Sequence, residues 1–139
     1  MVLDTTAGGL AFLVGRLVFG ALLAFMGFNH FMDLDGMSGY AAAKGIPAPR
    51  LAVIGSGLML IGGGLSLAVG VFPLLGAAAL AVFFLGVTPL MHDFWSVEDP
   101  EQRQGEMTHL LKNATLFGTA LVFIAISGTA WPYALNVGL

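Results

Sequence analysis

Long apolar stretches dominate the chain, and two short polar connections separate them. The stretch from Leu51 to Met91 contains no charged side chain. One straight helix of that length would span about 60 Å, which is twice the thickness of the hydrocarbon core of a bilayer. We therefore expect the stretch to turn once, at Gly70-Val71-Phe72-Pro73, because glycine commonly follows the end of a helix and proline commonly begins one.

Two further apolar stretches flank this central pair. Together they predict four membrane-spanning helices at about residues 8–31, 50–69, 72–92 and 108–129. Four crossings use most of a 139-residue chain, so the predicted fold class is all-α, an integral membrane four-helix bundle in one domain over residues 1–139. In the first polar connection, Tyr40 to Lys44 are expected to form a short helical turn at the membrane surface.

The basic residues lie on one side of this arrangement. Four crossings place both polar connections at one membrane surface, and both termini with the Gly70 turn at the other. The first surface carries Lys44, Arg50, Arg103 and Lys112. The positive-inside rule therefore predicts a multi-pass protein of the cell membrane, with residues 32–49 and 93–107 in the cytoplasm and both termini outside. The first residues contain no Lys or Arg, so the first helix is expected to be retained rather than cleaved as a signal peptide.

Composition narrows the classes of function. Charged residues make up 9% of the chain, against about 25% in soluble domains, which excludes a large soluble catalytic domain. The net charge of -3 provides no basic surface, so no nucleic-acid partner is expected. Cysteine is absent, which excludes disulfides, thiolate nucleophiles, Fe–S ligation and covalent haem attachment through this chain. No covalently bound cofactor is expected, and a redox centre would belong to a partner.

One charged residue lies deep in the first apolar stretch. Arg16 is about 12 Å from the predicted start of its helix, and an arginine near the centre of a bilayer costs about 2.5 to 3.5 kcal/mol to insert. No acidic residue lies within the apolar stretches. The expected partners are Ser66 and carbonyls around Gly62 to Gly64, hydroxyls of the last helix, or the polar head of a bound molecule. Both a carbonyl-satisfied arginine and a ligand-binding one remain open.

All three histidines fall at the predicted cytoplasmic ends of helices. His30 ends the first, His92 ends the third and His109 begins the fourth, where Asn113 shares its face at a spacing of i, i+4. Three imidazoles can bind a metal, relay a proton or hydrogen-bond a carbonyl-bearing ligand such as a quinone. No metal site is predicted, because no tight pair of ligands occurs within one helix. The alternative is three interfacial histidines, each satisfied by water and helix ends.

Small and aromatic residues suggest how the helices pack. Helices in lipid associate through close backbone approach, which predicts contacts at small residues: Gly20, Ala24, Gly62, Ser66, Gly70, Ala114 and Gly118. The run Gly62 to Gly64 exceeds what packing requires, because each glycine costs about 1 kcal/mol of helix propensity relative to alanine. We expect it to leave a groove for a ligand. Aromatic residues follow the third and fourth helices, and interfacial anchoring is expected of Phe94-Trp95 and Trp131-Pro132-Tyr133.

Several short motifs follow one another in order along nearly the whole chain. They are Gly15-Arg16-Leu17 with Gly20, Gly45-Ile46-Pro47-Ala48-Pro49, Gly63-Gly64, His92-Asp93-Phe94-Trp95 and His109-Leu110-Leu111-Lys112-Asn113. In this order they resemble the DoxX family of small four-helix membrane proteins. The resemblance implies a membrane protein associated with quinone-linked or thiol-stress redox systems, and it marks as functional positions Arg16, His92, Trp95, His109 and Asn113. Many members carry a Glu shortly before the Gly-Gly pair, where this chain has Gly57 to Leu60, so an ion pair with Arg16 from that position is lost.

Two hypotheses from different classes follow. In the first, the protein is a small membrane subunit of a redox system that binds a quinone or lipid head without covalent attachment, while a partner protein supplies the redox centre. The residues predicted to bind this ligand are Arg16, His30, His92, Trp95, His109 and Asn113. In the second, it is a non-catalytic membrane scaffold or assembly protein. Either hypothesis leaves catalytic activity open, and the glycine-rich faces predict a homo-oligomer in the bilayer.

Overall fold

The structure, a computed structural model, describes residues 2–139 and is built from helices. In chain order these are η1 (Val2–Asp4), α1 (Thr6–Met32), α2 (Leu34–Ala43), α3 (Pro49–Val69), α4 (Pro73–Met91), η2 (Phe94–Ser96) and α5 (Pro100–Ile126). Within residues 2–139 the β structure amounts to an isolated bridge between Val71 and Val137. α1, α3, α4 with the segment that follows it, and α5 are long and apolar enough to cross a membrane. The predicted all-α membrane fold is confirmed.

Capping side chains explain where several helices begin. The hydroxyl of Thr5 accepts a hydrogen bond from the backbone N–H of Gly8 (3.0 Å) at the start of α1. Asp33 accepts one from Gly36 (3.2 Å), and α2 is therefore a full helix rather than the short turn expected near Tyr40. Asp99 accepts one from Gln102 (2.9 Å), so α5 begins at Pro100, well before the expected start at residue 108.

The turn between α3 and α4 lies where the sequence predicts it. Gly70 ends α3 with φ 73°, in the left-handed region that glycine adopts at no steric cost, and α4 begins at Pro73. The C-terminal segment lies against this turn. The N–H of Phe72 donates to the carbonyl of Val137 (2.7 Å), and the N–H of Leu135 donates to that of Val69 (2.9 Å).

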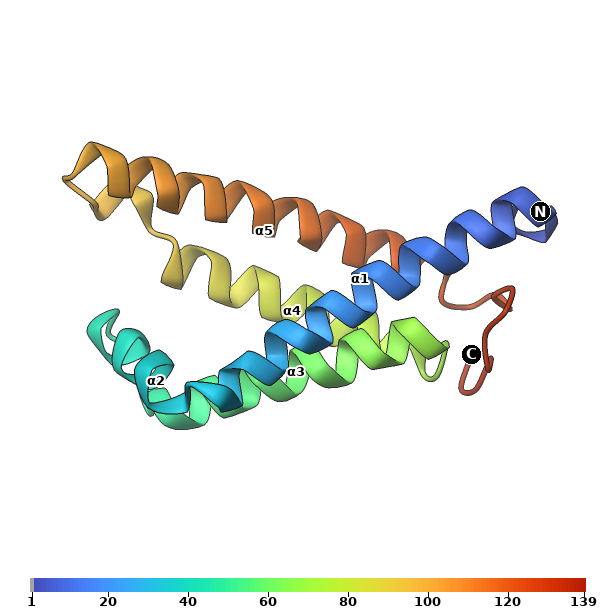
Figure 1. The fold of residues 1–139 in the computed structure, drawn as a ribbon, viewed down its shortest axis with the longest axis horizontal. Helices are drawn as coiled ribbons and strands as arrows, with labels where there is room; N and C mark the ends of the chain where they lie inside the picture. The colour runs from blue at the N-terminus through green and yellow to red at the C-terminus, as the bar shows by residue number, and fades with distance from the viewer. Residues whose placement is uncertain (1) are drawn as a thin grey trace.

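The long helices that are neighbours along the chain also pack against each other. α1 packs along α3, α3 along α4, and α4 along α5, while α2 packs on α3. Figure 1 shows both termini and the α3–α4 turn at one end of the molecule, which we call the terminal end. α2 and the α4–α5 connection lie at the opposite end, which we call the α2 end (Figure 1).

Consecutive glycines of α3 face three different environments. A Cβ on Gly64 would overlap the carbonyl oxygen of Gly20 on α1, and one on Gly63 would lie 2.6 Å from Leu80 of α4. A Cβ on Gly62 would meet nothing within 4 Å. The predicted contact at Gly20 is therefore present. The contacts predicted at Gly62 and Gly118 are wrong, because a Cβ at either position meets open space.

The core at the terminal end is aromatic. Trp131 is 2% exposed and meets Phe12 edge-on, with ring centroids 5.0 Å apart. Its indole N–H donates to the carbonyl of Ile126 (3.0 Å). The expectation that Trp131 anchors the protein at the interface is wrong, because the chain after α5 folds back and buries the indole beneath α1.

Candidate functional site

Arg16 is 1% exposed and bonds to backbone carbonyls from two distant segments. Its Nη1 donates to the carbonyl of Ala68, and its Nη2 to those of Pro132 (3.3 Å) and Tyr133. Ala68 lies in the last turn of α3, where carbonyls lack helical partners and the helix dipole favours a cation. Arg16 thus joins α1, α3 and the C-terminal segment at the terminal end.

Ser66, an expected partner of Arg16, bonds elsewhere. Its hydroxyl lies 2.6 Å from the carbonyl oxygen of Val71 and 3.1 Å from that of Phe72, across the α3–α4 turn. Backbone carbonyls therefore satisfy the Nη atoms of Arg16, as one of the two alternatives expects. These carbonyls lie beyond the glycine run of residues 62–64 rather than within it.

His92 and His109 come together at the α2 end. Their rings stack with centroids 5.2 Å apart and planes at 26°. Nδ1 of His92 lies 2.7 Å from Oε2 of Glu106. The other ring nitrogen of His92, Nε2, takes no part in this contact. Sequence reasoning missed Glu106 because it assigned residues 93–107 to a connection. On a helix that begins at Pro100, the i, i+3 spacing of Glu106 and His109 would have indicated it.

α2 contributes two more polar side chains to this region. Lys44 Nζ lies 2.5 Å from Asp93 Oδ1, and the hydroxyl of Tyr40 donates to Oε1 of Glu106 (3.2 Å). We call the whole set the interfacial network: Tyr40, Lys44, His92, Asp93, Glu106 and His109. The hydrogen bond to Asp93 raises the pKa of Lys44 above its ordinary value. Burial and the charge of Glu106 raise the pKa of Tyr40. The network ties α2 to the α4–α5 connection.

We expect the hold on α2 to weaken at alkaline pH. Because the pKa of Lys44 is higher in the folded protein, the stabilisation from this pair is complete below the ordinary pKa of lysine and is lost as pH rises through the raised value. A nitroxide at Gly39→Cys on α2 should become more mobile above that pH. In a Lys44→Met background the label should be mobile already at pH 7. An immobile label in Lys44→Met at pH 7 would show that the pair does not hold α2.

One turn further into the bundle lie two buried polar side chains, of which Thr88 lacks a hydrogen-bond partner in the described part of the chain. Thr88 is 8% exposed and Asn113 is 6% exposed. Within residues 2–139, the buried side-chain atoms without a hydrogen-bond partner are Thr88 Oγ1 and, at the other end of the molecule, Arg16 Nε. α4 and α5 run antiparallel. Thr88 precedes His92 by one helical turn and Asn113 follows His109 by one turn, so both lie at the same depth in the bundle. Unpaired buried polar groups cost about 1 to 3 kcal/mol each, and a bound water or ligand is the usual explanation.

The other predicted site residues lie apart from this group. His30 Nδ1 is 2.9 Å from the carbonyl oxygen of Met26 on its own helix, and its Cβ faces Gly57 of α3. Trp95 is 59% exposed and packs edge-on against Phe94. Arg16 lies towards the opposite end of α1 from His30, about 20 Å along the helix. The structure therefore brings together His92 and His109, with Asn113 one turn away, and leaves Arg16, His30 and Trp95 separate.

The described part of the chain, residues 2–139, contains no group of three His, Asp or Glu side chains placed to hold a metal ion. The polar groups that converge are the stacked imidazoles, one carboxylate, one hydroxyl and one amide. This set can donate hydrogen bonds to a ligand and accept them from it. We call the line of Thr88, His92, His109 and Asn113 the polar seam.

Comparison with known proteins identifies the family. The sequence model of the DoxX family matches residues 11–93, which is more than half of the chain. The matched region runs from α1 to the end of α4 and includes Arg16 and His92, whereas Asn113 and His109 lie beyond it. No curated protein and no solved structure matches the chain. With a family match over most of its length and four membrane-spanning helices, the chain belongs to the DoxX family.

Proposed function

We propose that this protein is a membrane subunit of a quinone-linked redox system and that it binds a quinone head group at the polar seam. The observation that carries the proposal is the unpartnered buried hydroxyl of Thr88, which lies with the buried Asn113 side chain one turn beneath two stacked imidazoles. A quinone head has carbonyl oxygens that accept hydrogen bonds and a flat ring that packs beside imidazoles. These features match the hydrogen-bonding groups and the stacked rings of the seam.

The carboxylate behind His92 suits both redox forms of such a ligand. Glu106 engages Nδ1, so Nε2 remains for the ligand. A protonated His92 can donate from Nε2 to a quinone carbonyl, and a neutral one with its proton on Nδ1 can accept from a quinol hydroxyl. Glu106 can accept the hydrogen bond from Nδ1 in both of these states, because each keeps a proton on Nδ1. In this proposal the redox centre belongs to a partner protein.

The proposal places the ligand head at the α2 end and gives Arg16 no contact with it. A head group at the seam cannot also reach a guanidinium near the other end of α1, which already donates to three carbonyls. The positive-inside rule, applied to Lys44, Arg50, Arg103 and Lys112, supports a cytoplasmic position for the α2 end. A soluble redox partner would then meet the seam from the cytoplasm.

A second candidate is a scaffold without a ligand. It is supported by the Lys44–Asp93 and Tyr40–Glu106 pairs, which join α2 to α4 and α5 and give these polar residues a structural use. In that case His92 and His109 would contribute only to the same attachment. The two candidates differ in whether the seam binds a quinone.

Binding of a short-chain ubiquinone analogue to the purified protein in lipid nanodiscs distinguishes them. We expect saturable binding at one site, with His109→Ala weakening it at least tenfold, or about 1.4 kcal/mol. Asn113→Leu should weaken it similarly, because it removes the buried amide from the seam. His30→Ala is the matched control and should bind as the native protein does. Absence of binding by the native protein, or equal binding by His109→Ala, would favour the scaffold.

A further inference from the structure

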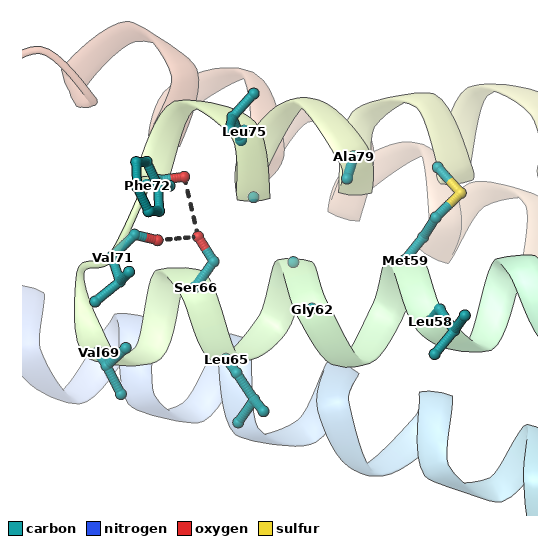
Figure 2. Close-up of a pocket in the computed structure, with 12 residues that line it drawn as sticks. Leu58, Met59, Gly62, Leu65, Ser66, Val69, Val71, Phe72, Leu75 and Ala79 are labelled. Atoms are coloured by element: carbon teal, nitrogen blue, oxygen red, sulfur yellow. Dashed lines mark hydrogen bonds between the residues drawn. The ribbon is translucent and has the colours of Figure 1, made fainter. Parts of the chain in front are cut away.

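An open groove between α3 and α4 lies at the terminal end, away from the polar seam. Its volume is about 490 Å³, within the roughly 300 to 1,000 Å³ of typical ligand sites. Figure 2 shows Ser66 and Gly62 on the α3 side and Leu75 and Ala79 on the α4 side. The glycine run thus leaves a groove, as the sequence predicts, although only Gly62 meets open space.

The walls of the groove offer contacts to hydrocarbon and no unused charge. Ser66 is its one polar side chain, and its hydroxyl already bonds with the carbonyl oxygens of Val71 and Phe72 (Figure 2). The rest of the lining is apolar: Leu58, Met59, Gly62, Gly63, Leu65, Val69, Val71, Phe72, Leu75, Gly76 and Ala79. A polar or ionic ligand would lose hydration here without compensation.

The length of the groove matches one leaflet of a bilayer. Its lining on α3 runs from Leu58 to Val69, which corresponds to about 16 Å of helix against about 15 Å for half of the hydrocarbon core. One end lies at the α3–α4 turn, where α3 reaches its surface of the membrane. At the other end the side chain of Met59 lies between the two helices (Figure 2).

We propose that one acyl chain of a bilayer phospholipid occupies this groove, with its head group beside the α3–α4 turn. A second copy of the chain would pack a helix along α3 across both leaflets. The groove ends about halfway along α3, so a second copy fits it less well. The isoprenoid tail of a quinone held at the polar seam fits less well too, because its head would lie at the α2 end. This proposal does not depend on quinone binding.

Filling the groove tests the proposal. Gly62→Leu should fold, because a Cβ at Gly62 meets nothing within 4 Å, and its side chain would occupy the groove from α3. Ala79→Leu fills it from α4. The control is Gly55→Leu on the same helix, which also points into open space but lies outside the groove. Circular dichroism of each variant checks that the helices are retained.

The measurement is native mass spectrometry of protein released from nanodiscs of palmitoyl-oleoyl phosphatidylethanolamine and phosphatidylglycerol. The native protein and Gly55→Leu should each retain one phospholipid per chain, and both groove-filling variants should lose it at least tenfold. Equal retention by all four proteins would overturn the proposal. So would a prenyl lipid retained in place of the phospholipid after expression in cells. A dimer broken by both Gly62→Leu and Gly55→Leu, with no lipid retained, would assign the face to a second copy.

Discussion

Replacing Gly20 by alanine is expected to separate α1 from α3, although it adds only one methyl group. A Cβ at Gly20 would overlap the carbonyl oxygen of Gly64 and would lie 3.0 Å from the N atom of Ala68. These are backbone atoms, so the clash is relieved only if one helix moves. Overpacking of a closely packed core costs about 1 to 3 kcal/mol and occasionally more, and we expect the upper end because no side chain can yield.

A neighbouring glycine on α1 provides the control for this prediction. A Cβ at Gly15 would meet nothing within 4 Å, so Gly15→Ala should stabilise the helix by up to about 1 kcal/mol through propensity alone. The free energy of unfolding, measured by circular dichroism during titration with a denaturing detergent, compares both variants with the native protein. A Gly20→Ala variant within about 0.5 kcal/mol of the native value, as for an ordinary surface substitution, would contradict the close approach of α1 and α3.

Arg16→Met is expected to release the C-terminal segment. The substitution keeps a long side chain but removes the N–H groups that bond to Ala68, Pro132 and Tyr133. An unsatisfied buried carbonyl costs about 1 to 3 kcal/mol, and the two carbonyls on the C-terminal segment can reach water only if that segment detaches. We therefore expect a loss of about 3 kcal/mol in the stability of the attached state.

Because the native chain has no cysteine, a single introduced thiol reports on this release. Ala134→Cys suits the purpose, since Ala134 lies against Gly70 at the α3–α4 turn. Its labelling by a water-soluble maleimide should be at least tenfold faster when Arg16→Met is also present. Arg16→Lys should give an intermediate rate, because one ammonium group cannot reproduce the planar spread of the guanidinium. A rate unaffected by Arg16→Met would show that the arginine does not hold the segment.

Sequence alone predicts the membrane helices of this protein because their signal is local and strong. The uncharged stretch from Leu51 to Met91 exceeds one bilayer thickness, so a turn near Gly70 follows from length alone. The start of α5 is predicted too late because the hydropathy signal at its first residues is weak. Residues 100–107 are polar and resemble a loop, although Asp99 followed by Pro100 is a typical helix start that outweighs hydropathy.

The parts of the site that were missed depend on tertiary contacts. The stacking of His92 on His109 follows from two antiparallel helices joined at the same end, and the sequence supports it. The carbonyls that hold Arg16 come from a segment more than a hundred residues away, and no periodic pattern marks them. Likewise, nothing near Trp131 in the sequence distinguishes a buried indole from one at the interface.

The bonds of Arg16 also bear on the order in which the protein is made. A chain synthesised from its N-terminus provides the carbonyl of Ala68 as soon as the first two long helices have been inserted. The carbonyls of Pro132 and Tyr133 emerge from the ribosome only after α5. Until then the newly inserted α1 carries an incompletely bonded cation, which must reach towards lipid head groups at its own end of the membrane. A segment translated after all four long helices therefore completes the environment of a residue in the first of them.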